Sequence, residues 1–223
     1  MPYLLDRRIS SIDYAIISHY DTDHIGGILY LMENYKIKNI VISKQPEESD
    51  NLKKFVKILN EKHQNLLYVK KGDRLQIEQD IYFNILFPDT NNFVKENALN
   101  NNSIACKLCY KNFSMLFTGD IEKEGENVLL KEYEKTGELQ STILKAPHHG
   151  SKTSSTKDFL NKINPKITLI GVGKNNLYGH PNEEVLKRLQ DAGSQIFRTD
   201  KDGEITVTVD WRGRVGVKKF LNY

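Results

Sequence analysis

Four residues of types that commonly bind metal ions lie within six positions near the start of the chain. They are His19, Asp21, Asp23 and His24. Neutral imidazole and ionised carboxylate groups are suitable ligands for divalent zinc, manganese or iron. An acidic turn that only caps the next helix is the simpler alternative, but two histidines and two aspartates in so short a run favour a metal site.

The elements on either side of this run predict how its side chains are positioned. Tyr14-Ala15-Ile16-Ile17 has the pattern of a buried strand, and Gly26-Gly27 is followed by apolar residues at helical spacing. A turn between a strand and a helix lets several side chains converge, whereas alternate residues of a strand point to opposite faces. The sequence therefore predicts that the candidate ligands share a strand-to-helix turn.

The run resembles the His-x-His-x-Asp-His signature of the metallo-β-lactamase superfamily, with Asp21 in place of the second histidine. In this form it is similar to the hydrolase domain of ComEC-type competence proteins, which take up DNA. The resemblance extends from about Tyr3 to Gly203. It implies an α/β fold, an αββα sandwich of two mixed β-sheets flanked by helices. The strands that begin such domains are missing here, so we expect a fragment of a longer chain or a short, exposed sheet edge.

Two later motifs supply further ligands that the resemblance implies. Thr118-Gly119-Asp120 matches the motif whose aspartate bridges two metals, although an aspartate here would equally suit the cap of the following helix. The pair His148-His149 matches a His-His-Gly-Ser motif in which one histidine completes the site. The sequence leaves open which histidine this is, with a slight preference for His148.

The segment 89–102 is rich in asparagine and predicts a long loop. Where lactonase-like relatives place another histidine, the chain has asparagines, of which Asn102 is a candidate ligand. We therefore expect two divalent ions, zinc or manganese, in two half-sites that share Asp120. One half-site has His19, Asp21 and Asn102, and the other has Asp23, His24 and His148. Because oxygen ligands favour harder ions, manganese or magnesium should compete with zinc in the first half-site.

Polar residues after the histidine pair predict a place for a substrate phosphate. Ser151, Lys152 and Ser154 offer hydroxyl groups and one cation, although a merely exposed polar loop fits the sequence equally well. His180, in Gly179-His180-Pro181, also matches the family pattern and is expected to contact the phosphate or to protonate the leaving group. Asp23, Asp120 and His180 are the predicted catalytic residues.

The composition sets broad limits on these interpretations. The 223 residues suffice for one domain, 1–223, and the net charge of +3 is too small to identify a polyanionic partner. Cys106 and Cys109 lie in a predicted strand and have no second pair with which to form a zinc site. The sequence contains neither a signal peptide nor an apolar stretch long enough to cross a membrane, so the localisation stays unknown.

Together these features predict a metal-dependent hydrolase, a phosphodiesterase or nuclease that acts on DNA. The alternatives are a small-molecule hydrolase of the same fold, acting on a phosphodiester or a lactone, and a DNA-binding module without catalytic activity. The expected partners are DNA as substrate, a membrane channel protein of the kind to which ComEC-type domains are joined, and a second copy of the chain.

Overall fold

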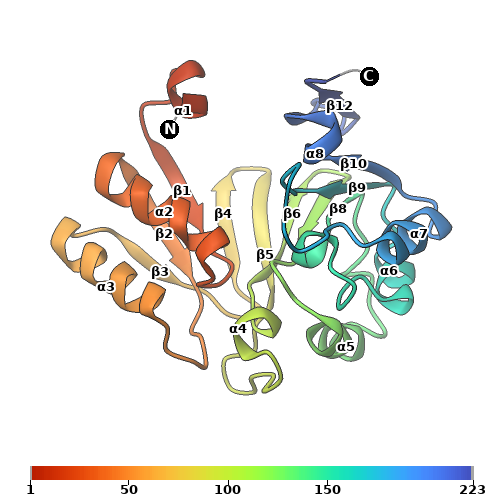
Figure 1. Ribbon diagram of the computed structural model, residues 1–223, viewed down its shortest axis with the longest axis horizontal. Helices are drawn as coiled ribbons and strands as arrows, with labels where there is room; N and C mark the ends of the chain where they lie inside the picture. The colour runs from red at the N-terminus through yellow and green to blue at the C-terminus, as the bar shows by residue number, and fades with distance from the viewer. Residues whose placement is uncertain (1, 222–223) are drawn as a thin grey trace.

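The first third of the chain folds as alternating strands and helices in the computed structural model, which describes residues 2–221. The elements are α1 (Pro2–Asp6), β1 (Ile12–Ile16), α2 (Thr22–Asn34), β2 (Ile37–Ile42), α3 (Asp50–Lys62) and β3 (Leu66–Tyr68). The three strands form a parallel sheet in the order β1-β2-β3, and α2 and α3 lie side by side along it (Figure 1).

Alternation along β1 explains why this sheet is covered on both faces. Ala15 and Ile17 pack with the apolar side chains of α2 and α3, whereas Tyr14 and Ile16 pack toward the second sheet. Successive strand residues point to opposite faces, so an uninterrupted apolar run suits a strand buried between two layers.

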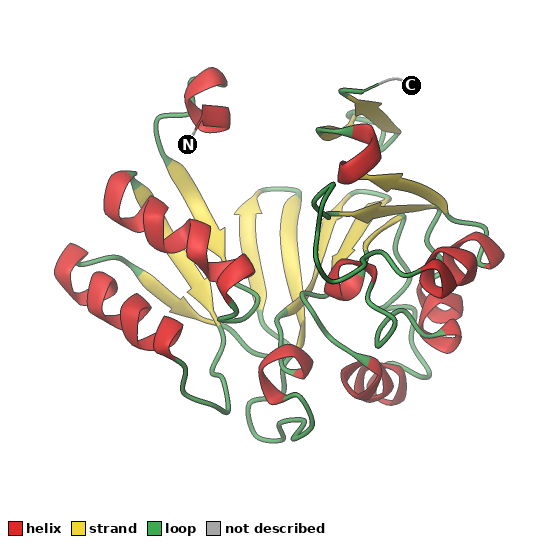
Figure 2. Ribbon diagram, in the orientation of Figure 1, coloured by secondary structure: helices red, strands yellow, loops and turns green. Residues whose placement is uncertain are grey.

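The second sheet has seven strands in the order β10-β9-β8-β7-β6-β5-β4 (Figure 2). They are β4 (Arg74–Glu78), β5 (Ile81–Phe87), β6 (Ala105–Tyr110), β7 (Phe113–Phe117), β8 (Ile143–Lys145), β9 (Ile167–Ile170) and β10 (Gln195–Arg198). Pairing is antiparallel from β4 to β7 and parallel from β7 to β10.

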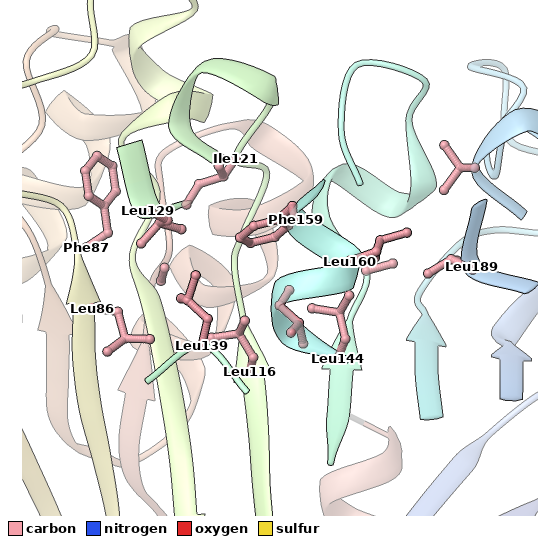
Figure 3. Close-up of a cluster of buried hydrophobic side chains, with 14 of the residues drawn as sticks. Leu86, Phe87, Leu116, Ile121, Leu129, Leu139, Leu144, Phe159, Leu160 and Leu189 are labelled. Atoms are coloured by element: carbon pink, nitrogen blue, oxygen red, sulfur yellow. The ribbon is translucent and has the colours of Figure 1, made fainter. Parts of the chain in front are cut away.

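Helices α5 (Lys123–Glu132), α6 (Lys157–Ile163) and α7 (Glu183–Asp191) cover the outer face of the second sheet. The largest buried cluster lies between them and the strands; Figure 3 shows Leu116 and Leu144 of the sheet near Phe159 and Leu160 of α6. The order of layers is therefore helix, sheet, sheet, helix, which confirms the predicted αββα sandwich. The three-stranded sheet of β1, β2 and β3 is parallel throughout, whereas mixed pairing was predicted for both sheets of the sandwich.

The remaining elements are short. They are α4 (Ala98–Asn101), the 3-10 helix η1 (Pro147–Gly150), α8 (Thr199–Asp202), and a hairpin of β11 (Ile205–Val209) and β12 (Val215–Lys219). The predicted long loop 89–102 thus ends in a helical turn. Among residues 2–221, no helix has the length and apolar character needed to span a membrane.

Strand direction brings the motifs together. Because β7, β8 and β9 are parallel neighbours, their carboxyl ends lie at one edge of the second sheet and lead into Asp120, the histidine pair and the loop that ends at His180. The backbone N–H of Ile104, just before β6, donates to the carbonyl of Ser18 at 2.9 Å. This bond joins the turn after β1 to the same edge.

Candidate metal centre

Four of the predicted ligands converge on one point. One ligand atom from each of Asp23, His24, Asp120 and His149 lies within 4.8 Å of the other three. His24 Nε2 is 3.1 Å from Asp120 Oδ1 and 3.2 Å from His149 Nε2. His149 Nε2 is 3.3 Å from Asp23 Oδ2. Donors held about 2.0–2.2 Å from a four-coordinate ion are about 3.3–3.6 Å apart, so this cluster fits one divalent cation.

A second group, His19 and Asp21, adjoins this cluster beside His24. His19 is buried beneath the partly exposed Asp21, and His19 Nε2 is 3.6 Å from Asp21 Oδ2. The rings of His19 and His24 are 4.1 Å apart between centroids. His19 Nε2 and Asp120 Oδ1 are both buried, and neither has a partner with hydrogen-bond geometry among the described residues, although His24 Nε2 lies 3.1 Å from Asp120 Oδ1. Buried polar atoms without partners are rare, so these two atoms fit ligands that face a cation.

A single hydroxyl orients the first two histidines. Ser18 Oγ lies 3.1 Å from His19 Nδ1 and 3.2 Å from His24 Nδ1. Ser103 Oγ, fully buried, lies 3.2 Å from His19 Nδ1 and accepts the backbone N–H of Asp120 at 3.2 Å. Partners of this kind on the far nitrogen fix the ring of a metal-binding histidine. Sequence reasoning did not identify either serine as part of the site.

The two consecutive histidines differ in their surroundings. His149 Nδ1 lies 2.7 Å from the carbonyl of Gly171, so it can donate there while Nε2 faces Asp120 and Asp23. His148 Nε2 is 3.8 Å from Asp120 Oδ2, and its Nδ1 is 3.3 Å from Glu122 Oε1. His149 is therefore the histidine that joins the four-residue cluster, and His148 lies beside it.

The backbone at this pair is strained. His148 and His149 have φ angles of 47° and 52°, in the left-handed region that non-glycine residues rarely adopt. Such conformations cost about 1–2 kcal/mol per residue. Strain that persists at a candidate site, where it directs two side chains toward the metal cluster, is typical of functional geometry.

Charge within the cluster favours ionised aspartates and a neutral imidazole. Burial alone would raise the pKa of Asp120, but His24, with help from His149 and His19, holds the pKa of this carboxyl below its usual value. The neighbouring His19 imidazole lowers the pKa of Asp21. Burial lowers the pKa of His149. These are the protonation states in which carboxylate and imidazole bind metal ions.

Gly119 lets the second motif approach the first. A Cβ at this position would lie 2.6 Å from Ser103 Cβ and 2.9 Å from Ser18 Cβ, and the φ angle is +54°. Both facts require glycine, because a side chain would collide with the two serines that orient the histidines.

Asn102 is a correction to the predicted ligand set. Its Oδ1 accepts from the backbone N–H of Val94 at 3.0 Å, and its Nδ2 donates to the carbonyls of Val94 and Ala98. The side chain is fully buried and closes the loop before β6. Its polar atoms are therefore used for folding, and the structure does not bring it to the cluster.

The predicted phosphate-binding hydroxyls also require correction. Ser154 is fully buried, and its hydroxyl donates to the carbonyl of Ile121 at 2.9 Å. Ser151 is buried too and shares a hydrogen bond with Thr153 Oγ1. Neither hydroxyl faces solvent where a substrate would bind. Lys152 is exposed and stays available.

His180 lies at the rim of the centre, on the loop after β9. Its ring is 5.7 Å from that of His148 in an edge-on arrangement and nearly parallel to Tyr178. Burial, followed by the neighbouring His148 and His149, lowers the pKa of His180. The structure therefore brings His180 near the centre, outside the cluster of four.

Comparisons with known proteins agree with this geometry. The model of the family described as "Metallo-beta-lactamase superfamily" matches residues 2–174. The chain is 34% identical to ComE operon protein 3 of Bacillus subtilis over 216 residues, covering 97% of this chain and 27% of that protein. It is 30% identical to competence protein ComA of Neisseria gonorrhoeae over 224 residues, covering 98% of this chain and 28% of that protein. The expected resemblance to competence proteins is confirmed, and the chain spans roughly a quarter of each.

A solved structure shares the fold. CmlA, a diiron beta-hydroxylase from Streptomyces venezuelae, superposes with a TM-score of 0.58 at 13% identity, over 85% of this chain and 44% of that chain. At so low an identity, the likeness extends to the fold alone.

Proposed function

This chain belongs to the metallo-β-lactamase superfamily, and from that premise we propose that it is a metal-dependent phosphodiesterase that cleaves DNA. The observation that carries the proposal is the four-residue cluster of Asp23, His24, Asp120 and His149, beside which His19 and Asp21 form a second group of possible ligands. Its relatives among competence proteins support DNA as the substrate.

Two divalent ions held in this way would supply an activated water and positive charge near the phosphoryl oxygens. The donor set supports zinc or manganese, since imidazole suits the first and carboxylate the second. With Asn102 used elsewhere, the first group keeps one imidazole and carboxylates, a set rich in oxygen. We therefore retain the hypothesis that manganese competes with zinc there.

The chain's own residues have distinct roles in this proposal. Hydrolysis forms a P–O bond to water and breaks a P–O bond to a deoxyribose oxygen, which takes up a proton from solvent as it leaves. Asp120, buried and ionised, would hold metal and lies against the rings of His24 and His149. Asp23 has a largely exposed side chain, so a carboxylate oxygen can accept the proton that water releases. His180, neutral near pH 7 because its pKa is lowered, is assigned to hydrogen bonding with a phosphate oxygen.

One assay tests this function against its alternatives. The purified chain is incubated with single-stranded DNA, double-stranded DNA or bis(p-nitrophenyl) phosphate, with manganese or zinc, with and without a chelator. We expect metal-dependent DNA cleavage that Asp23→Ala reduces by about 100-fold or more, the size of a lost acid–base contribution. Asp13→Ala is the matched control, because Asp13 is an exposed aspartate on β1 paired with Lys38.

The other outcomes identify the other functions. Cleavage of the small ester alone would mean a small-molecule hydrolase. DNA binding without cleavage of any substrate, whichever metal is supplied, would mean a binding module and would refute the proposed activity.

A further inference from the structure

An exposed aromatic ring stands beside the metal centre. Tyr178 is 82% exposed, and its neighbour Leu177 is 97% exposed. The Tyr178 ring lies 5.8 Å from that of His180 at an interplanar angle of 17°, a stacked arrangement. His180 in turn contacts His148. The three rings therefore form a series that extends outward from the histidine pair to solvent.

A cleft connects this ring to the metal ligands. It has a volume of about 460 Å³. Its lining includes Asp23, His149, Val172, Asn176, Tyr178 and His180. A molecule held at the metal centre can therefore extend along the cleft to the tyrosine.

The loop that carries Tyr178 is held in a defined conformation. Asn176 Oδ1 accepts the backbone N–H of His180 at 2.9 Å, and its Nδ2 donates to the carbonyl of His180 at 2.7 Å. The same amide group donates to the carbonyl of Gly173 at 3.1 Å. At the end of the loop, the backbone N–H of Asn182 donates to the carbonyl of Gly150, beside the histidine pair. The exposed ring is thus pre-positioned relative to the metal centre.

The loop has one cationic side chain, and the carboxylate in the lining of the cleft is that of Asp23. Residues 171–181 contain one lysine, Lys174, which is exposed, and no aspartate or glutamate. Proteins that bind single strands without sequence preference combine cationic groups with aromatic rings on which bases stack. In a duplex, each internal base already stacks on both faces, so an isolated protein ring can reach only an unpaired or terminal base.

We propose that Tyr178 is a stacking platform for one unpaired nucleobase of a single-stranded DNA substrate whose neighbouring phosphate lies at the metal centre. This inference rests on the proposed function and specifies its substrate. The platform selects unpaired DNA and tolerates any base, because every base has an aromatic face.

Binding of an uncleaved strand tests the platform separately from catalysis. The probe is a fluorescent single-stranded oligothymidylate with phosphorothioate linkages, which resist hydrolysis, and binding is measured with manganese present. We expect Tyr178→Ala to weaken binding about 5- to 150-fold, the size of the loss of one stacked base. Tyr178→Phe, which keeps the ring, should bind within about twofold of the unmodified protein.

Two controls separate stacking from a general effect. An oligomer of abasic deoxyribose phosphates should bind the unmodified protein and Tyr178→Ala equally. Tyr30→Ala removes an exposed tyrosine on α2, outside the cleft lining, and should leave binding unchanged. Metal content and melting temperature of each variant verify that the centre and the fold persist.

The results distinguish the platform from the proposed activity. Unchanged oligothymidylate binding by Tyr178→Ala, an equal loss on the abasic oligomer, or no binding by the unmodified protein would overturn the platform. If the unmodified protein cleaves no DNA but Tyr178→Ala still shows the base-dependent loss, the platform stands and the nuclease proposal fails.

Discussion

Replacing each histidine of the pair in turn should reveal which one binds metal. We predict that His149→Ala loses a metal ion and that His148→Ala keeps it, although sequence analysis slightly favours His148 as the ligand. The comparison is well matched, because both residues have left-handed φ angles and are partly exposed. Alanine therefore has a similar backbone effect at the two positions.

The expected magnitude follows from the distances. His149 Nε2 lies 3.2 Å from His24 Nε2, 3.3 Å from Asp23 Oδ2 and 3.6 Å from Asp120 Oδ2, close to the separations of about 3.3–3.6 Å around one ion. Loss of an outer partner of a ligand costs about 10- to 100-fold in metal affinity, so loss of the ligand itself should exceed about 100-fold. That factor corresponds to about 2.7 kcal/mol.

His148 should behave differently, because its Nε2 is 3.8 Å from Asp120 Oδ2 and its Nδ1 is near Glu122. We expect at most about a tenfold loss of metal affinity for His148→Ala, the lower limit for an outer partner. Affinity is measured by competition with a coloured chelator, and stoichiometry by elemental analysis. Full metal content in His149→Ala, together with loss of an ion in His148→Ala, would refute the assignment.

Three further substitutions test the geometry around this pair. Gly119→Ala should lower the free energy of unfolding by about 1–3 kcal/mol through its collision with Ser103, as thermal unfolding can measure. It should also lower metal affinity by at least about tenfold, as chelator competition can measure. His148→Gly should relieve about 1–2 kcal/mol of left-handed strain and raise the melting temperature by about 2–4 °C per kcal/mol, as calorimetry can check. Asp21→His, which adds an imidazole beside His19, should raise the ratio of zinc to manganese bound from an equimolar mixture, and an unchanged ratio would contradict the oxygen-rich first group.

The layered fold follows from local sequence signals. In β1, the uninterrupted apolar run predicts a strand covered on both faces, and the structure has Ala15 packed toward the helices and Ile16 toward the second sheet. A helix after this strand is predicted too, but α2 begins at Thr22, so Asp23 and His24 lie in its first turn and Gly26-Gly27 lie within it rather than at its opening. The existence of both elements depends on residues close in sequence, which is why periodicity captures them.

Residues used for internal hydrogen bonds are harder to identify, because their partners lie far away in sequence. Ser154 and Asn102 are of residue types expected in a binding loop, yet both bond to backbone groups inside the protein. Ser154 donates to the carbonyl of Ile121, and Asn102 bonds to the N–H and the carbonyl of Val94. A buried N–H or C=O must find a partner, and the sequence does not show which side chain will serve it. The long asparagine-rich segment is therefore a structural support for the site, although its length and polarity are typical of a loop that contacts substrate.

The same reasoning explains why Ser103 was missed as a contributor and why the histidine pair was ambiguous. Ser103 stands where lactonase-like relatives have a further ligand nearby, but its hydroxyl lies against His19 Nδ1 and accepts the N–H of Asp120. It connects two motifs separated by about a hundred residues, so no local pattern marks it. Likewise, the carbonyl that orients His149 belongs to Gly171, in the loop after β9. Residue types are enough to identify a run of metal-binding residues. The atoms that orient each ligand, however, depend on which strand ends the fold brings together at one edge of the second sheet.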